Sequence, residues 1–316
     1  MSHLASFDHI ILFFVLGLFA SWIKSDLSIP DSVSKFLSIF LLLCLGLKGG
    51  HEVRFAASLE GLFLVLGVGG LSCFLIPTIL FFTLRARLGY ANASALAASF
   101  GSVSAVTFVA AQGILENEGI VFNGYMVAIM ALMEIPAILV AIYYFQKYSS
   151  EENFTNRSLI KSIFSAKSVV LLLGGFAIGL AMNQKSWLGI SPVVQDGFKG
   201  VLAFFLLDLG LVAQKQLREA WTYKSVAFPV ALLLPLVFGS AALLVVTGLG
   251  ASRGDSILLA VLVGSASYIA APAAIRASVP QANPSLYMAL PLGLTFPMNL
   301  IFGIPLYIKL ESIINT

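Results

Sequence analysis

Two short segments of small and hydroxyl-bearing residues interrupt apolar stretches of the chain. The first is the GSVS segment at 101–104, and the second is the GSAS segment at 264–267. Pro272 follows the second segment and favours a helix break there, because proline has no amide hydrogen to donate. Free N–H groups at a helix break can bind an anion, and freed carbonyl and hydroxyl oxygens suit a hard cation such as sodium. We therefore predict that an anion and sodium bind at Gly101, Ser102, Ser104, Thr107, Ser265, Ser267 and Tyr268.

An alternative interpretation needs no ligand. Glycines and serines spaced along a membrane helix let two helices approach closely, and a single segment of this kind favours that role. Two segments of the same form at matching positions in the chain favour a binding site instead.

Glu134 is the strongest ionisable candidate within an apolar stretch. It lies just before Pro136 in the sequence MEIPAI. A charge inside a membrane costs about 2.5 to 3.5 kcal/mol or more and usually has a purpose. Glu134 could complete a sodium site with Ser104, or it could be a protonated structural acid. For Asp208 we favour a salt bridge or helix-end position, and for Arg276 an extended side chain that reaches the membrane surface.

The composition is that of an integral membrane protein. Of the 316 residues, 59% are apolar and only 10% are charged, whereas soluble chains carry about 25% charged residues. The net charge of +3 and the lack of a basic cluster exclude nucleic-acid binding. No HExxH, GxSxG or GxxxxGK[ST] motif occurs, and no span holds a paired nucleophile and base, so an enzyme is not expected.

No cofactor is expected besides sodium as a coupling ion. Cys44 and Cys73 lie in apolar stretches and are expected to be buried without forming a disulfide.

Hydropathy and turn residues predict an all-α polytopic membrane protein with ten transmembrane helices. The predicted spans are about 8–23, 32–48, 58–84, 91–115, 121–146, 166–183, 194–213, 225–250, 255–277 and 285–310.

The two halves of the chain carry the same landmarks in the same order. The LGL sequence at 45–47 recurs at 209–211. The GSVS segment corresponds to the GSAS segment, and Tyr125-Met126 corresponds to Tyr287-Met288. A repeat of five spans is odd in number, so the second copy enters the membrane from the opposite side. We predict two inverted repeats, at 1–148 and 166–316, joined by a cytoplasmic linker at 149–165. The discontinuous fourth and ninth helices are predicted to cross near the membrane midplane.

Counting lysine and arginine residues orients the chain. With both termini outside the cytoplasm, 12 of these residues fall on the cytoplasmic side and 6 on the outer side. Short loops favour a bacterial inner membrane as the location.

Together these motifs resemble the SbtA-type sodium-dependent bicarbonate transporter family. The resemblance rests on LGLKGG at 45–50, FGSVSAVT at 100–107, MEIPAI at 133–138 and SASYIAAPAAIR at 265–276, and it covers almost the whole chain. It implies two inverted sets of five helices, a homotrimer, and sodium and bicarbonate bound between the fourth and ninth spans.

This chain is a divergent, non-cyanobacterial-looking member. Tyr268 replaces the family's aspartate after the paired serines, Ala271 replaces a glycine, and Glu134 stands where cyanobacterial members have aspartate. The central linker is also shorter than in those members, so the resemblance gives little support for a PII-like regulator as partner.

Our hypothesis is a permease of the symporter type, a secondary active transporter that imports bicarbonate with sodium. The first alternative is coupling to protons, or transport of another small inorganic or carboxylate anion. The second is a membrane sensor or scaffold that does not transport.

Overall fold

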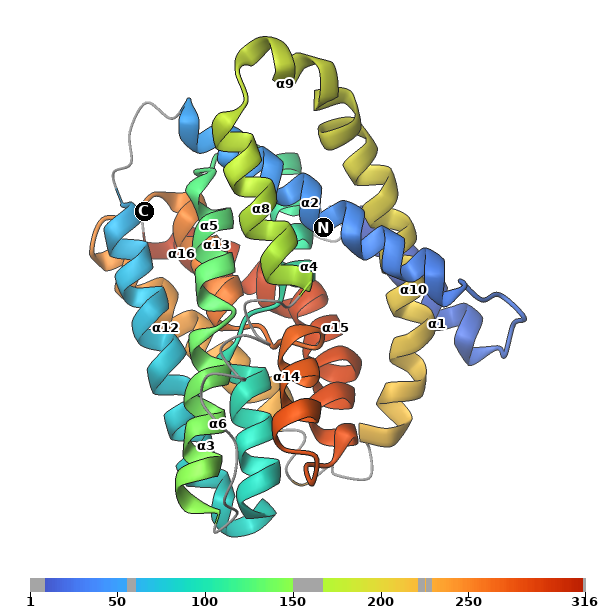
Figure 1. Ribbon diagram of the computed structural model, residues 1–316, viewed down its shortest axis with the longest axis vertical. Helices are drawn as coiled ribbons and strands as arrows, with labels where there is room; N and C mark the ends of the chain where they lie inside the picture. The colour runs from blue at the N-terminus through green and yellow to red at the C-terminus, as the bar shows by residue number, and fades with distance from the viewer. Residues whose placement is uncertain (1–8, 56–60, 150–166, 221–224, 226–228, 315–316) are drawn as a thin grey trace.

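The computed structural model describes residues 9–55, 61–149, 167–220, 225 and 229–314, and within these ranges the regular structure is helical, as predicted (Figure 1). The α-helices are α1 (His9–Trp22), α2 (Asp31–Arg54), α3 (Leu62–Gly101), α4 (Ala105–Asn117), α5 (Tyr125–Met133), α6 (Pro136–Tyr148), α8 (Lys167–Ala181), α9 (Gln184–Ser191), α10 (Gly197–Ala220), α12 (Leu234–Gly248), α13 (Arg253–Val263), α14 (Ala270–Ser278), α15 (Phe296–Met298) and α16 (Ile304–Ile314). Wider π-helical turns extend several of them, at Pro192–Asp196, Pro229–Leu233, Ser285–Ala289, Pro291–Thr295 and Asn299–Gly303.

Four helices form one side of the molecule, which we call the panel: α1, α2, α8 and α10. Helix α1 packs along α10, and α2 packs along α8 (Figure 1). Glycines make both contacts close, because a Cβ atom on Gly17 or Gly210 would collide with the backbone of the other helix. Gly50 and Gly179 have the same relation across α2 and α8. The panel is therefore held by two backbone-to-backbone contacts of the kind that small residues allow.

Helices α3 to α6 and α12 to α16 form a second unit that we call the body. Helix α3 folds back on itself at Gly89, whose φ of 76° is left-handed and suits glycine. The two arms of α3 then meet where Gly101 lies against the ring of Pro77, with no room for a side chain. The centre of the body is fully buried, with runs such as Ala95–Ala98 and Ile257–Leu262 at 0% exposure.

Five helical stretches of the described residues are long and apolar enough to cross a membrane. They are Asp31–Arg54, Leu62–Asn117, Tyr125–Tyr148, Pro229–Gly248 and Ser285–Ile314. The second of these covers the third predicted span from residue 62 onward and the whole of the fourth, because α3 reverses at Gly89. The number of ten spans thus stays a prediction. The predicted linker at 149–165 lies outside the described residues except for Ser149.

Candidate substrate and ion site

The predicted helix breaks are both present. Helix α3 ends at Gly101 and α4 begins at Ala105, while α13 ends at Val263 and α14 begins at Ala270. The two interruptions touch each other across the body. The Ser267 amide donates to the Ser99 carbonyl at 2.7 Å, and the Ser104 amide donates to Ser265 Oγ at 2.9 Å. Residues about 160 positions apart in the chain therefore build one site.

Three of the predicted hydroxyl groups, those of Ser104, Ser265 and Ser267, bond to backbone groups at the ends of the broken helices. Ser104 is the N-cap of α4, and its Oγ accepts hydrogen bonds from the amide and the hydroxyl of Thr107, at 3.2 and 2.9 Å. Ser267 Oγ accepts from the Ala271 amide at 3.1 Å, and Ser265 Oγ donates to the Leu262 carbonyl at 2.8 Å. These caps satisfy backbone groups that a helix end leaves open. The Ser104 amide, which the sequence analysis would offer to an anion, already donates to Ser265 Oγ.

Glu134 lies at the junction of α5 and α6, beside the first break. Its side chain is buried, with the residue only 5% exposed. The Ser102 hydroxyl donates to the Glu134 backbone carbonyl at 2.9 Å, which fixes the first break against this junction.

A small cavity of about 10 Å³ lies where the two breaks and the α5–α6 junction meet. Four of the predicted site residues line it together: Ser104, Glu134, Ser267 and Tyr268. Its volume is close to the room that one water molecule needs. A carboxylate and hydroxyls around a space of this size form an oxygen-rich site for a small hard cation.

The other predicted residues lie behind the cavity lining. Ser265 and Thr107 contact Ser104 through the hydrogen bonds above, and Ser102 contacts Glu134. Gly101 packs against Pro77, as the packing interpretation of small residues requires. For the glycine of the first segment, helix packing is therefore the role that the structure displays.

Tyr268 differs from the other lining residues. Its ring packs edge-on against Phe296, with ring centroids 5.8 Å apart. Its hydroxyl oxygen is buried without a hydrogen-bond partner among the described residues. The tyrosine fills space at the second break and brings a polar atom, but no charge, to the cavity.

Asn299 is a residue that the sequence analysis missed. Its side-chain amide donates to the Gly264 carbonyl at 2.7 Å and is buried, so it holds the end of α13 at the second break. The signal was present in the sequence FPMN at 296–299, where a polar residue follows a proline within an apolar stretch.

Asp208 and Arg276 do not line the cavity. Asp208 is buried in α10 of the panel, and Arg276 is exposed with its guanidinium near the sulfur of Met288, at 3.3 Å. Cys44 and Cys73 are free and buried, as predicted. Among the described residues, no group of three or more His, Cys, Asp and Glu side chains could hold a metal ion.

These features define a class: a multi-pass membrane protein in which two interrupted helices meet beside a buried carboxylate. The family model of the Na+-dependent bicarbonate transporter superfamily matches residues 9–312, and the chain belongs to this superfamily. A search of curated proteins found no match. The superfamily consists of transporters and not of enzymes, so the predictions of the family and of a protein that is not an enzyme are confirmed.

Proposed function

We propose that this protein is a secondary transporter that imports bicarbonate together with sodium. The observation that carries the proposal is the meeting of the two helix breaks at the cavity beside Glu134. A single buried carboxylate among hydroxyl groups suits a monovalent cation, and a cation bound there offsets the charge of an anion nearby. The superfamily's name supports the same two ions.

Sodium is expected at Ser104 and Glu134, in the cavity that Ser267 and Tyr268 also line. Bicarbonate is expected against the same breaks, because the starts of helices such as α4 and α14 favour anions. The hydroxyl groups of Ser104 and Ser267 each accept a hydrogen bond from a backbone amide at the start of α4 and α14. We expect these two hydrogen bonds to be kept when the ions bind.

We also propose that the chain folds as ten spans in two inverted repeats of five, at 1–148 and 166–316. Reciprocal packing in the panel supports this arrangement. Helix α1, first in its half, packs on α10, and α8, first in the other half, packs on α2. A two-fold axis that exchanges the halves produces such a pair of contacts, and inverted repeats of this kind allow alternating access.

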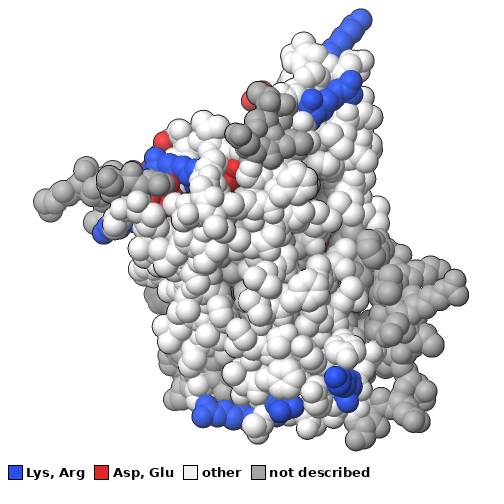
Figure 2. Space-filling model, turned by 90° about the vertical axis from the view of Figure 1, so that its left-hand side faces the viewer, with Lys and Arg blue, Asp and Glu red and all other residues white. Residues whose placement is uncertain are grey.

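The ends of the molecule support the proposed orientation. Arg85, Arg87 and Lys147 lie at the end where α3 reverses and α6 stops, and the Arg85 guanidinium is 5.3 Å from the ring centre of Tyr148. Figure 2 shows basic side chains along the lower edge and both signs of charge near the upper edge of the face in view. The basic end is expected to face the cytoplasm of a bacterial inner membrane. We further expect a homotrimer in the lipid bilayer.

The direct test is uptake of labelled bicarbonate into proteoliposomes with and without an inward sodium gradient. We expect uptake to require the gradient. Equal uptake in both conditions would refute sodium coupling. Uptake driven by a proton gradient would favour proton coupling, the alternative suggested by a tyrosine instead of an aspartate at position 268. Competition by other small anions would identify a different cargo, and a sensor or scaffold would take up none.

A further inference from the structure

A large polar cavity opens between the panel and the body, at the end of the molecule far from Arg85. It has a volume of about 380 Å³ and is lined by Cys44, Leu45, Lys48, Glu52, Gln112, Gly113, Glu116, Val194, Gln195, Asp196, Phe198, Lys199 and Leu202. Helices α2 and α10 of the panel form one wall, and α4 of the body forms the other. We call this cavity the vestibule.

The vestibule is the first of three cavities along one seam. The second, of about 10 Å³, shares Leu202 with the vestibule and is lined almost wholly by apolar side chains of α2, α4 and α10. The third is the cavity at Glu134, which shares Leu42, Ala105, Val106 and Ile269 with the second. Along α4, the distance from Ala105 to Glu116 is about 16 Å at 1.5 Å per residue. The seam thus runs from the vestibule to the ion site through a narrow apolar stretch.

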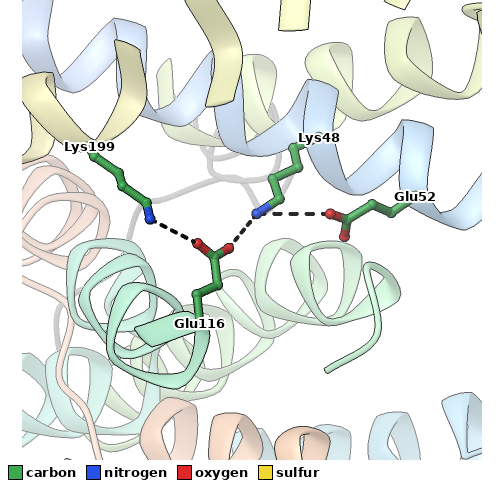
Figure 3. Close-up of polar contacts among 4 residues, drawn as sticks. All are labelled: Lys48, Glu52, Glu116 and Lys199. Carbon is green, nitrogen blue, oxygen red and sulfur yellow. Dashed lines mark hydrogen bonds and ion pairs between the residues drawn. The ribbon is translucent and has the colours of Figure 1, made fainter. Parts of the chain in front are cut away.

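Ion pairs cross the seam within the vestibule (Figure 3). Glu116 of the body contacts Lys48 of α2 at 2.6 Å and Lys199 of α10 at 3.8 Å, and Lys48 is also 3.9 Å from Glu52. One carboxylate of α4 therefore contacts two of the four panel helices, α2 and α10. We call the contacts of Glu116 with the two lysines the bridge.

The bridge and the apolar stretch both depend on where α4 lies relative to the panel. An ion cannot pass the apolar stretch as it is packed here, because a 10 Å³ space holds about one water molecule and Ser38 is the one polar side chain among the residues that line it. Opening the stretch requires α4 to shift against α2 and α10, and such a shift separates Glu116 from the lysines. The bridge thus favours the arrangement in which the passage is shut.

The geometry points to the vestibule as the access route from this face to the ion site, and to the Glu116 bridge as the latch that keeps the route shut at its apolar stretch. This inference rests on the proposed transport function, since it assigns a path to the same site. Removing the latch should raise the fraction of molecules in which the route is open.

Native cysteines allow the first test on the whole protein in proteoliposomes. The chain has two, of which Cys44 lines the vestibule and Cys73 is buried in the body, where its sulfur lies 3.4 Å from the Met133 carbonyl. Cys44 is 4% exposed and Cys73 is 0% exposed, so a hydrophilic methanethiosulfonate reagent added on the Lys48 side should modify Cys44 slowly and leave Cys73 unmodified. Modification of Cys44 from the opposite side only, or from neither side, would overturn the vestibule as the access route.

The second test places one cysteine at the inner end of the apolar stretch, at Ala105, which also lines the cavity at Glu134, in a chain carrying Cys44→Ala and Cys73→Ala. Exposed ion pairs are individually weak, so we expect Glu116→Gln to raise the rate of modification at this position about two- to tenfold. Lys199→Gln removes one arm of the bridge and should give a smaller increase. Glu118→Gln is the matched control, because Glu118 lies two residues further on, is exposed, and forms none of the ion pairs of the described residues.

Equal rates for Glu116→Gln and Glu118→Gln would overturn the latch, provided that both variants elute as the parent protein does in size-exclusion chromatography. These measurements do not depend on the cargo. If bicarbonate uptake is not observed but Glu116→Gln raises the modification rate of the cysteine at position 105, the latch is supported and bicarbonate is excluded as the cargo. If uptake is observed and the two rates are equal, only the latch falls.

Discussion

The two helix breaks meet in one site but are held in different ways. The first, at 102–104, is fixed by the Ser102 hydroxyl to the backbone of Glu134, a residue with a buried carboxyl group. The second, at 264–269, is longer and is fixed at Gly264 by the neutral amide of Asn299. We infer that the first break carries the ion dependence of the site, and that the second supplies shape and stability.

Glu134→Gln tests this difference most strongly. The substitution keeps the shape of the side chain but removes the charge that we assign to sodium. A hydrogen bond or contact to a charged group is worth about 1.5 to 3 kcal/mol, so we expect sodium-driven uptake to fall about 10- to 100-fold. The protein should still fold, as judged by size-exclusion chromatography. Uptake that keeps its sodium dependence in this variant would remove Glu134 from the ion site.

Asn299→Leu should act on stability instead. It leaves the Gly264 carbonyl buried without its donor, and an unsatisfied buried group costs about 1 to 3 kcal/mol. We expect a lower temperature of thermal unfolding in detergent, with the apparent sodium affinity of the remaining folded protein unchanged. A changed sodium affinity at unchanged stability would instead assign the Asn299 amide to the ion site. It would contradict the inference that only the first break determines ion binding.

The caps of the two breaks allow a matched pair of smaller changes. Ser104→Ala and Ser267→Ala each remove one cap, at a cost of about 1 kcal/mol in unfolding free energy. Both should lower thermal stability by similar amounts, but Ser104→Ala should also weaken sodium affinity, because this serine is assigned to sodium together with Glu134. If the two variants show the same sodium titration, the breaks contribute equally to cation binding.

Tyr268→Phe should have the smallest effect. The tyrosine hydroxyl has no hydrogen-bond partner among the described residues, and the ring contact with Phe296 is kept in the variant. We expect unfolding free energy to change by no more than about 0.5 kcal/mol. A loss of sodium-driven uptake, with stability unchanged, would instead show that the hydroxyl contacts one of the transported ions.

The sequence was sufficient to locate both breaks, because glycine, serine and proline in apolar stretches are local signals and recur in each half. It also identified Glu134, since a carboxylate in an apolar stretch is costly. It did not distinguish a ligand from a cap: the capping roles of Ser104 and Ser267 depend on where each helix begins. The Glu116 bridge joins residues 68 and 83 positions apart, and pattern reasoning does not reach such pairs.

The pairing of α1 with α10 has a consequence for biosynthesis. Gly17 meets Gly210, so α1 lacks its close neighbour until about 190 further residues have been translated, which takes roughly 10 to 40 seconds at typical rates. Helix α2 likewise waits for α8. During that interval the glycine-lined surfaces of both early helices face lipid or the insertion machinery, and a nascent chain halted after the first half cannot complete its own scaffold.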